Sequence, residues 1–178
     1  FKFTTIREFD ISHNRIKNFE GFYFIYIKFL NCSFNEIENL IGTPELIGQD
    51  FDCSFNKLDT LKSTTKTVQG NLYCKGNNLK TLEGIPLVLG DINCSNNELI
   101  SLEGITNDKI KSFNCENNHL TDLKHLPKFC EGDLNCSFNP ISNLNDLDCQ
   151  ITGSFICKKS KITQLENNKK LIAQRVYI

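Results

Sequence analysis

Cysteine is the residue type with the widest chemistry in this chain, because thiolates bind metals, form disulfides and act as nucleophiles. The 178 residues include nine cysteines and no C-x-x-C pair. Seven of them recur every 20 or 21 residues: Cys32, Cys53, Cys74, Cys94, Cys115, Cys136 and Cys157. We expect these seven to point into one buried stack as small hydrophobic groups, which suits neither a disulfide nor a tetrahedral metal shell. Cys130 and Cys149 stand outside the series and are the only pair we would test for a disulfide.

The three histidines, His13, His119 and His125, could serve catalysis only beside a nucleophile and a group that orients the ring. His125 and Cys130 lie five residues apart, so the alternatives are a dyad or two surface residues of one loop. The sequence has no phosphate-binding glycine loop, no dinucleotide-binding turn and no metalloprotease helix motif. It therefore predicts a chain with no cofactor, no metal and no catalytic activity.

An internal repeat organises the whole chain. Each unit reads apolar, x, Cys, x, x, Asn, x, apolar, x, x, apolar, as in residues 72–82. Eight units begin at Phe9, Leu30, Phe51, Leu72, Ile92, Phe113, Leu134 and Phe155. The alternation around each cysteine predicts a short strand with one buried face, which only stacking against neighbouring units can bury.

This pattern resembles the leucine-rich-repeat family, whose core reads LxxLxLxxNxL, with Cys here in place of the third Leu. The repeat length and the Gly-x-Pro at 42–44 and 84–86 are similar to the short repeats of bacterial, phage and large-virus proteins. The resemblance covers nearly all of residues 1–178 and implies one domain. It implies an α/β-type repeat solenoid of about eight repeats, made mostly of short parallel β-strands and loops, with a parallel sheet on its concave side.

Asparagine recurs three residues after six of the seven repeat cysteines, where the strand turns inward, and Ser160 takes its place after Cys157. The asparagine amide can donate to and accept from backbone groups that the turn leaves unpaired, and a column of amides serves the next repeat too. The structural asparagines are Asn35, Asn56, Asn77, Asn97, Asn118 and Asn139, with Asn14 in the first repeat. Residues 165–178 break the pattern and predict an irregular or helical C-terminal cap, in which Leu171, Ile172 and Val176 cover the last open core.

Side chains that alternate with the buried ones must project from the concave face. They are small, polar and mildly acidic: Asp50, Asp52, Asn71, Tyr73, Asp91, Asn93, Ser112, Asn114, Asp133 and Asn135, followed by Ser33, Ser54, Lys75, Ser95, Glu116 and Ser137. The surface is either a solvated sheet face or a dock for a basic or polar partner. Calcium is disfavoured, because regular spacing along a flat sheet does not wrap an ion.

Aromatic side chains supply two further candidate binding features. Phe34, Phe55 and Phe138 stand directly before the repeat asparagines, where they either pack at the strand edge or, with Tyr73, anchor a partner. Residues 22–29 make the connecting arm of the first repeat far more aromatic than the others. Those rings either close the core near an end repeat or form an exposed patch that docks on a partner or a second copy.

Charge and hydropathy exclude some classes of partner. The net charge of −1 offers no basic excess for nucleic acid, and no apolar run approaches the roughly 20 residues that span a bilayer. Unpaired thiols predict a reducing compartment, the cytoplasm, and a host cytosol or a virion is the alternative location.

We expect a non-catalytic protein–protein interaction module, with a protein partner that the sequence does not identify. One alternative is a structural subunit of a larger assembly such as a virus particle. Another is a targeting domain whose catalytic domain lies outside this chain.

Overall fold

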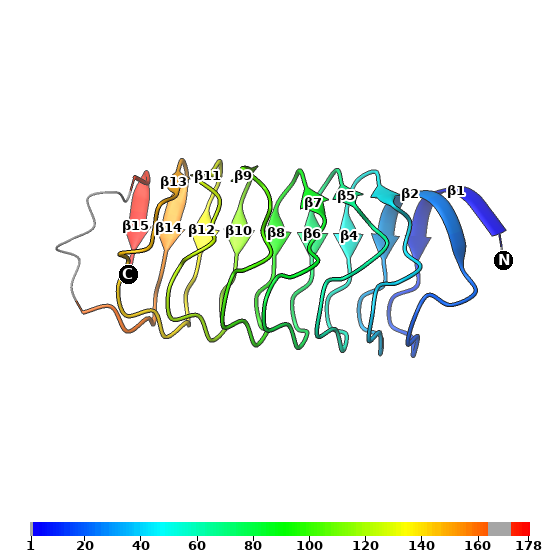
Figure 1. The fold of residues 1–178 in the computed structure, drawn as a ribbon, viewed down its shortest axis with the longest axis horizontal. Coiled ribbons are helices and arrows are strands. Elements are labelled where there is room, and N and C mark those ends of the chain that lie inside the picture. The colour runs from blue at the N-terminus through cyan, green and yellow to red at the C-terminus, as the bar shows by residue number, and fades with distance from the viewer. Residues whose placement is uncertain (1, 164–171) are drawn as a thin grey trace.

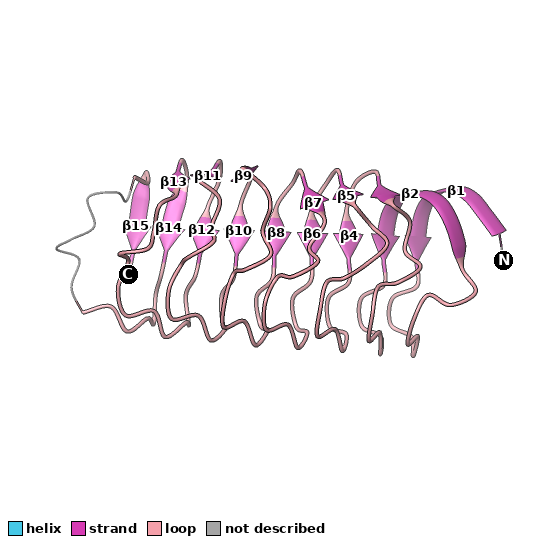
Figure 2. Cartoon of the chain, in the orientation of Figure 1, coloured by secondary structure: helices cyan, strands magenta, loops and turns pink. Residues whose placement is uncertain are grey.

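The computed structural model describes residues 2–163 and 172–178, and it shows a coil of strands and loops stacked along one axis (Figure 1). Within these two ranges the chain forms strands and loops without a helix (Figure 2), so no helix there could cross a membrane. The expected parallel β-solenoid of about eight turns, of the leucine-rich-repeat type, is confirmed. Any helical element that the α/β class would add is absent from the described ranges.

One strand of each turn joins a sheet that runs the length of the coil, here called the main sheet. In spatial order its strands are β1 (Lys2–Asp10), β2 (Tyr23–Asn31), β4 (Phe51–Asp52), β6 (Leu72–Tyr73), β8 (Ile92–Asn93), β10 (Phe113–Asn114), β12 (Leu134–Asn135), β14 (Ser154–Ile156) and β15 (Arg175–Tyr177). All neighbours are parallel, and Leu30, Phe51 and Leu72 pair in register. The repeat starts therefore form one row across the sheet.

A second row of short strands lies one corner away from the main sheet. It consists of β3 (Leu46–Ile47), β5 (Thr67–Val68) and β7 (Leu87–Val88), and of a separate group, β9 (Lys109–Ile110), β11 (Phe129–Cys130) and β13 (Gln150–Ile151). Strand β2 serves both rows, because Ile27 pairs with Ile47 and Leu30 pairs with Phe51. Strands β7 and β9 do not pair with each other, so the second row is interrupted in the middle of the molecule.

The core is a column of apolar side chains that fills the coil from end to end. Each turn from the second to the seventh supplies its strand residue, its cysteine and the two following apolar positions, as with Leu72, Cys74, Leu79 and Leu82. These side chains are almost completely buried, and no single turn could bury them alone. Stacking therefore supplies the hydrophobic stabilisation of the fold.

Part of the expected C-terminal cap lies outside the described residues, including Leu171. Residues 175–177 form strand β15, which pairs with β14, rather than an irregular or helical segment. Ile172 and Val176 are 58% and 45% exposed, so within the described chain they do not close the core as expected. The main sheet gains one more strand at this end instead.

Candidate functional site: the outer face of the main sheet

The asparagine column fixes how each strand leaves the main sheet. Asn56 Nδ2 donates to the carbonyls of Cys32 and Cys53 at 3.0 and 3.2 Å, while its Oδ1 accepts the Ile37 N–H at 2.9 Å. The same bridge between two turns is made by Asn35, Asn77, Asn97, Asn118 and Asn139. Because these amides are buried and fully used, they make the turn after each strand rigid.

The residue before each asparagine adopts a left-handed backbone conformation, which aims its side chain along the rim of the main sheet. Phe34 and Phe55 have φ of 54° and Phe138 has φ of 56°. The rim column comprises His13, Phe34, Phe55, Gly76, Asn96, Asn117, Phe138 and Lys159. Non-glycine residues rarely adopt this conformation, and from Phe34 to Phe138 the buried asparagine that follows holds it in place.

Three rings of the rim column form a stack, here called the aromatic rim. His13 and Phe34 stack with centroids 4.5 Å apart, and Phe34 and Phe55 with centroids 4.4 Å apart. Lys75 Nζ lies 5.1 Å from the centroid of the Phe55 ring. Phe34 and Phe55 remain 45% and 36% exposed, so they pack at the strand edge and still present apolar area to solvent. Phe138, 51% exposed, stands apart between Asn117 and Lys159 in the column.

A hollow of about 330 Å³ opens on the N-terminal half of the main sheet. This acidic hollow is lined by Glu8, Asp10, Phe29, Leu30, Asn31, Asp50, Asp52 and Tyr73. Four of the eight residues carry carboxylates, and the lining contains no lysine or arginine. The structure thus brings together Asp50, Asp52 and Tyr73 from the sequence prediction. It adds Glu8 and Asp10, which the same alternation would have identified had it been extended back to the first strand.

The three aspartates of the acidic hollow are held in place by main-chain N–H groups. Asp52 accepts from Ser54 at 2.9 Å, Asp50 accepts from Asn71 at 2.8 Å, and Asp10 accepts from Ser12 at 2.8 Å. The hydrogen bonds from Ser12 lower the pKa of Asp10. One oxygen of each aspartate is thereby fixed, and the second oxygen of Asp10 accepts from Asn31 Nδ2 at 3.1 Å.

Tyr73 stands beside these carboxylates. Its hydroxyl accepts from Asn71 Nδ2 at 3.0 Å. Burial raises the pKa of Tyr73, and the charges of Asp50, Asp91 and Asp52 raise it further. The side chain therefore presents a neutral phenol beside negative charge.

The other predicted face residues lie farther along the main sheet, outside the acidic hollow: Asp91, Asn93, Asn114, Asp133 and Asn135. Their side chains also accept main-chain N–H groups, as with Asp91 from Ser112 and Asn93 from Ser95. The expectation that the serines after each cysteine project from the face is wrong. Ser33, Ser54, Ser95 and Ser137 are at most 5% exposed. The chain has already begun its inward turn at this position, so strand alternation no longer applies.

All nine cysteines are free and buried. Burial raises the pKa of Cys74 to about 12, so at neutral pH its thiol is protonated and unreactive. Cys130 is not a surface residue, as one reading of the sequence had it, but lies inside β11 with its thiol donating to the Lys111 carbonyl at 3.0 Å. His125 is exposed. In the described residues, no three His, Cys, Asp or Glu side chains are arranged to hold a metal ion.

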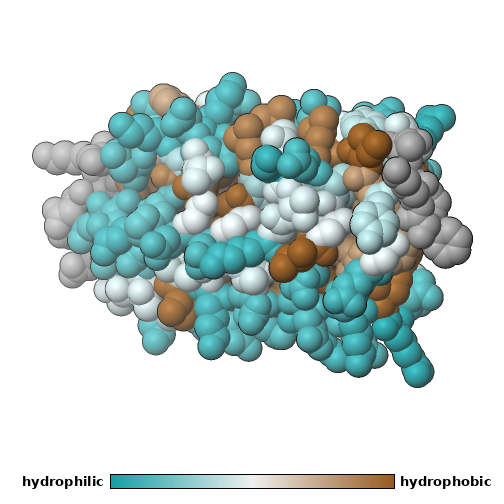
Figure 3. All heavy atoms as spheres, turned by 45° about the vertical axis from the view of Figure 1, so that its right-hand side comes forward, coloured by the Kyte–Doolittle hydropathy of each residue, from teal (hydrophilic) through white to brown (hydrophobic). Residues whose placement is uncertain are grey.

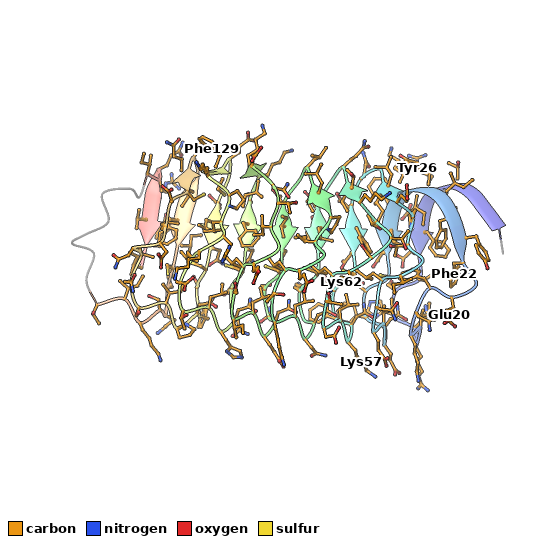
Figure 4. The ribbon with its side chains drawn as sticks, in the orientation of Figure 1. Glu20, Phe22, Tyr26, Lys57, Lys62 and Phe129 are labelled. Carbon is orange, nitrogen blue, oxygen red and sulfur yellow. The ribbon has the colours of Figure 1, made fainter. Side chains whose placement is uncertain are left out.

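The aromatic segment at residues 22–29 belongs mostly to strand β2 rather than to a connecting arm. On one face, the rings of Phe9, Phe22 and Phe24 meet with centroids 5.2 to 5.8 Å apart, and they close the core of the first turn (Figure 4 labels Phe22). On the other face, Tyr23 and Ile25 are 67% and 68% exposed. The core-closing reading therefore holds for Phe22 and Phe24, and Tyr23 and Ile25 are exposed, as the docking reading requires.

No protein-family model matches the chain, and no curated protein sequence matches it. Among solved structures, the chain is similar to YopM from Yersinia enterocolitica WA-314, a leucine-rich-repeat protein, with a TM-score of 0.50 and 18% identity over 89% of this chain. The chain spans 45% of the length of that protein. At this identity the likeness concerns the fold alone, and it supports a leucine-rich-repeat-like solenoid.

Proposed function

We propose that this chain is a non-catalytic protein–protein interaction module whose main sheet binds a basic segment of a partner protein. The observation that carries the proposal is the acidic hollow, in which four carboxylates converge beside Tyr73 and Phe29. The net charge of the chain is only −1, so this concentration of negative charge is local. A local field of one sign favours encounter with a partner segment of the opposite sign.

The scaffold is suited to recognition because it is rigid before the partner arrives. Buried amides such as Asn56 bridge consecutive turns, and the carboxylates of Asp50 and Asp52 accept main-chain N–H groups. Binding therefore orders few side chains and loses little conformational entropy. The neighbouring aromatic rim offers apolar contact area, which is the kind of surface that contributes strongly to binding energy.

Affinity capture from the native source tests this function, with partners identified by mass spectrometry. The wild-type chain is compared with the double variant Asp50→Asn/Asp52→Asn and with Glu38→Gln/Glu98→Gln, which removes two exposed carboxylates elsewhere. We expect one protein to be held by the wild type and the control, to be released by added salt, and to be lost with the double variant. Retention of the same partners by all three chains would contradict the proposal.

A second candidate function is a structural subunit of a larger assembly such as a virus particle. The exposed pair Tyr23 and Ile25 on β2 favours it, because adjacent exposed apolar residues on one strand face can contact a neighbour or a second copy. Sedimentation velocity tests this candidate. Self-association that Tyr23→Ser/Ile25→Ser abolishes supports it, and a monomer at high concentration argues against it. In both candidates the nine free thiols favour a reducing compartment.

A further inference from the structure

The main sheet has an open strand edge at each end of the coil. Within the described residues, strand β1 pairs with β2 alone and β15 pairs with β14 alone. Figure 1 shows these two strands at opposite ends of the molecule. The outer side of β1 is here called the N-terminal edge, and the outer side of β15 the C-terminal edge. An open edge presents unpaired main-chain N–H and C=O groups, which can pair with another strand.

The ladder between successive turns determines which main-chain groups stand at these edges. In the repeats that start at Leu30 to Phe113, the first residue donates its N–H to a carbonyl of the next turn, and so does the residue two places later. Val176 and Ile178 hold these two places in the last turn, because Val176 pairs in register with Phe155, the start of the repeat before it. Their N–H groups therefore point out of the C-terminal edge.

The N-terminal edge offers the matching acceptors. In the same ladder, the carbonyls that accept belong to the residues directly before and directly after a repeat start. In β1 these residues are Glu8 and Asp10, on either side of Phe9. The N–H of Ile11 donates to the Asn31 carbonyl at 2.8 Å. The main-chain groups of Glu8 and Asp10, at the alternate positions, therefore point away from β2. Two donors at one end of the chain thus correspond to two acceptors at the other.

Side chains of opposite charge stand at the two edges. In the register that continues the repeat, Arg175 of one copy stands beside Glu8 of the next, because each directly precedes its repeat start. Both side chains are exposed, and within the described residues neither belongs to a salt bridge. Opposite charges directly across from each other favour the pairing of two strands and help to fix its register.

The C-terminal edge leaves core positions of the repeat uncovered. Val176 and Ile178 are both 45% exposed, whereas Phe155 and Cys157, at the same positions one turn earlier, are buried. A following turn would bury these two side chains as β15 buries those of the turn before it. Removing this apolar area from water would stabilise the contact.

The N-terminal edge is uncovered in the same way. Ile6 and Phe9 pack against the core but are only partly buried, whereas Ile27 and Leu30, their partners in β2, are buried. Figure 3 turns this end of the molecule towards the viewer and shows hydrophobic side chains among hydrophilic ones there. Each end therefore exposes apolar surface that a further turn of the coil would cover.

We propose that copies of this chain stack head to tail, with the C-terminal edge of one copy pairing in parallel with the N-terminal edge of the next. A second copy is the occupant that these edges fit, because donors, acceptors, charges and repeat register correspond between the two ends of one chain. The contact joins two different surfaces, so every assembly keeps one open edge at each end and grows into a filament. At about 4.8 Å per strand, each copy adds about 40 Å to its length.

Sedimentation velocity at rising protein concentration tests the stacking, with the variants Arg175→Glu, Glu8→Arg and the two together. We expect the wild type to form species that grow beyond a dimer. Each single reversal places like charges across the contact and should raise the dissociation constant at least tenfold. The double variant restores the ion pair and should assemble within threefold of the wild type. Lys161→Glu makes the same charge change at another exposed position and should have no effect.

Val176→Pro tests the main-chain contact. This change removes an N–H donor of the C-terminal edge, and proline is tolerated on an edge strand where the N–H faces solvent. We expect a folded monomer, with the fold checked by circular dichroism. If this variant does not fold, the charge reversals alone decide the outcome.

A wild type that stays monomeric at millimolar concentration would overturn the proposal. So would a dimer that grows no further, or a double charge variant that assembles no better than the single ones. Assembly that Tyr23→Ser/Ile25→Ser abolishes would also overturn it, because the exposed pair on β2 would then hold the copies together. Arg175 lies outside the acidic hollow, so Arg175→Glu should still capture the partner of the main sheet. Loss of stacking and loss of the main-sheet function are therefore distinguishable.

Discussion

The side-chain amide of Asn77 donates a hydrogen bond to the main-chain carbonyl of Cys53, one turn earlier in the coil, at 3.1 Å. The same nitrogen reaches the Cys74 carbonyl at 3.0 Å, and the amide oxygen accepts the Leu58 N–H at 3.1 Å. Each of these carbonyls also accepts from a neighbouring amide of the column, Cys53 from Asn56 and Cys74 from Asn97, so one buried side chain is shared between main-chain groups of two turns. It also couples the stacking of the turns to the reversal of the chain after the strand.

Replacing this amide should be costly. Asn77→Ala leaves the buried Leu58 N–H without its partner and removes one of the two amide donors from each carbonyl, and we expect it to lower the free energy of unfolding by about 1–3 kcal/mol. Urea denaturation followed by circular dichroism measures the change. Asn78→Ala is the matched control, because Asn78 is exposed and its main-chain N–H still donates to the Leu58 carbonyl. Equal costs for the two variants would contradict the structural role of the column.

The sequence predicted the repeat architecture because the same few contacts recur in every turn. The starts at Leu72, Ile92 and Phe113 pair Cα to Cα across β6, β8 and β10, although one interval is a residue shorter. A register error would have moved every apolar residue to the wrong face. The second row of strands was not predicted, because a two-residue strand such as β5 is too short to show a period of two.

The candidate site was predicted less completely, for two physical reasons. Alternation holds only while the chain is extended, and the strand ends soon after Asn93, so Ser95 turns inward and donates to Asn93 Oδ1 at 2.7 Å. The acidic hollow also depends on the stacking of neighbouring turns, which brings Glu8 and Asp52 to one depression from positions far apart in the sequence. Nothing in the sequence indicates that the buried Oδ1 of Asn107 accepts no hydrogen bond within the described residues.

The carboxylate of Asp52 should contribute to binding rather than to stability. Asn31, Asn93, Asn114 and Asn135 occupy the equivalent position in other turns, and Asn93 accepts its Ser95 N–H as Asp52 accepts the Ser54 N–H. Asp52→Asn therefore keeps the hydrogen bond and removes repulsion within the acidic hollow. We expect unchanged or slightly higher stability, by up to about 1 kcal/mol in low salt.

Urea denaturation at two salt concentrations checks this prediction. Any gain should shrink in high salt, because screening already weakens the repulsion in the wild type. A loss of stability larger than that of the Glu38→Gln control would show that the carboxylate has a structural role instead.

Gly76 interrupts the rim column where the Phe55 ring needs space. A Cβ at Gly76 would stand 2.5 Å from Phe55 Cδ1, whereas Asn96 and Asn117 adopt the same left-handed conformation in their turns. The left-handed backbone conformation alone therefore does not require glycine at position 76. The space that the Phe55 ring occupies does require it. We expect Gly76→Asn to destabilise the wild type by about 1–2 kcal/mol but to be nearly neutral in a Phe55→Ser background. A double-mutant cycle measures this coupling, and additive effects would mean that glycine is needed for its backbone alone.

The buried thiols should make stability fall in alkaline solution. The pKa of Cys74 rises from 9.0 to about 12 in the folded chain because burial disfavours the thiolate. The folded state thus holds a proton that the unfolded state releases above pH 9. The stabilisation from this thiol is complete below pH 9 and declines as the pH rises from 9 towards 12, by about 1.4 kcal/mol per pH unit.

Lysines and tyrosines titrate in the same range, so the informative quantity is the difference between the wild type and Cys74→Val. Valine keeps a small apolar side chain in the stack and removes the titrating group. Urea denaturation at pH 7, 9 and 10.5 should show the wild type losing more stability than the variant between the last two points, by about 1–2 kcal/mol. Parallel curves would mean that the thiol ionises in the folded chain as readily as in the unfolded one, so that it is not sealed within the core.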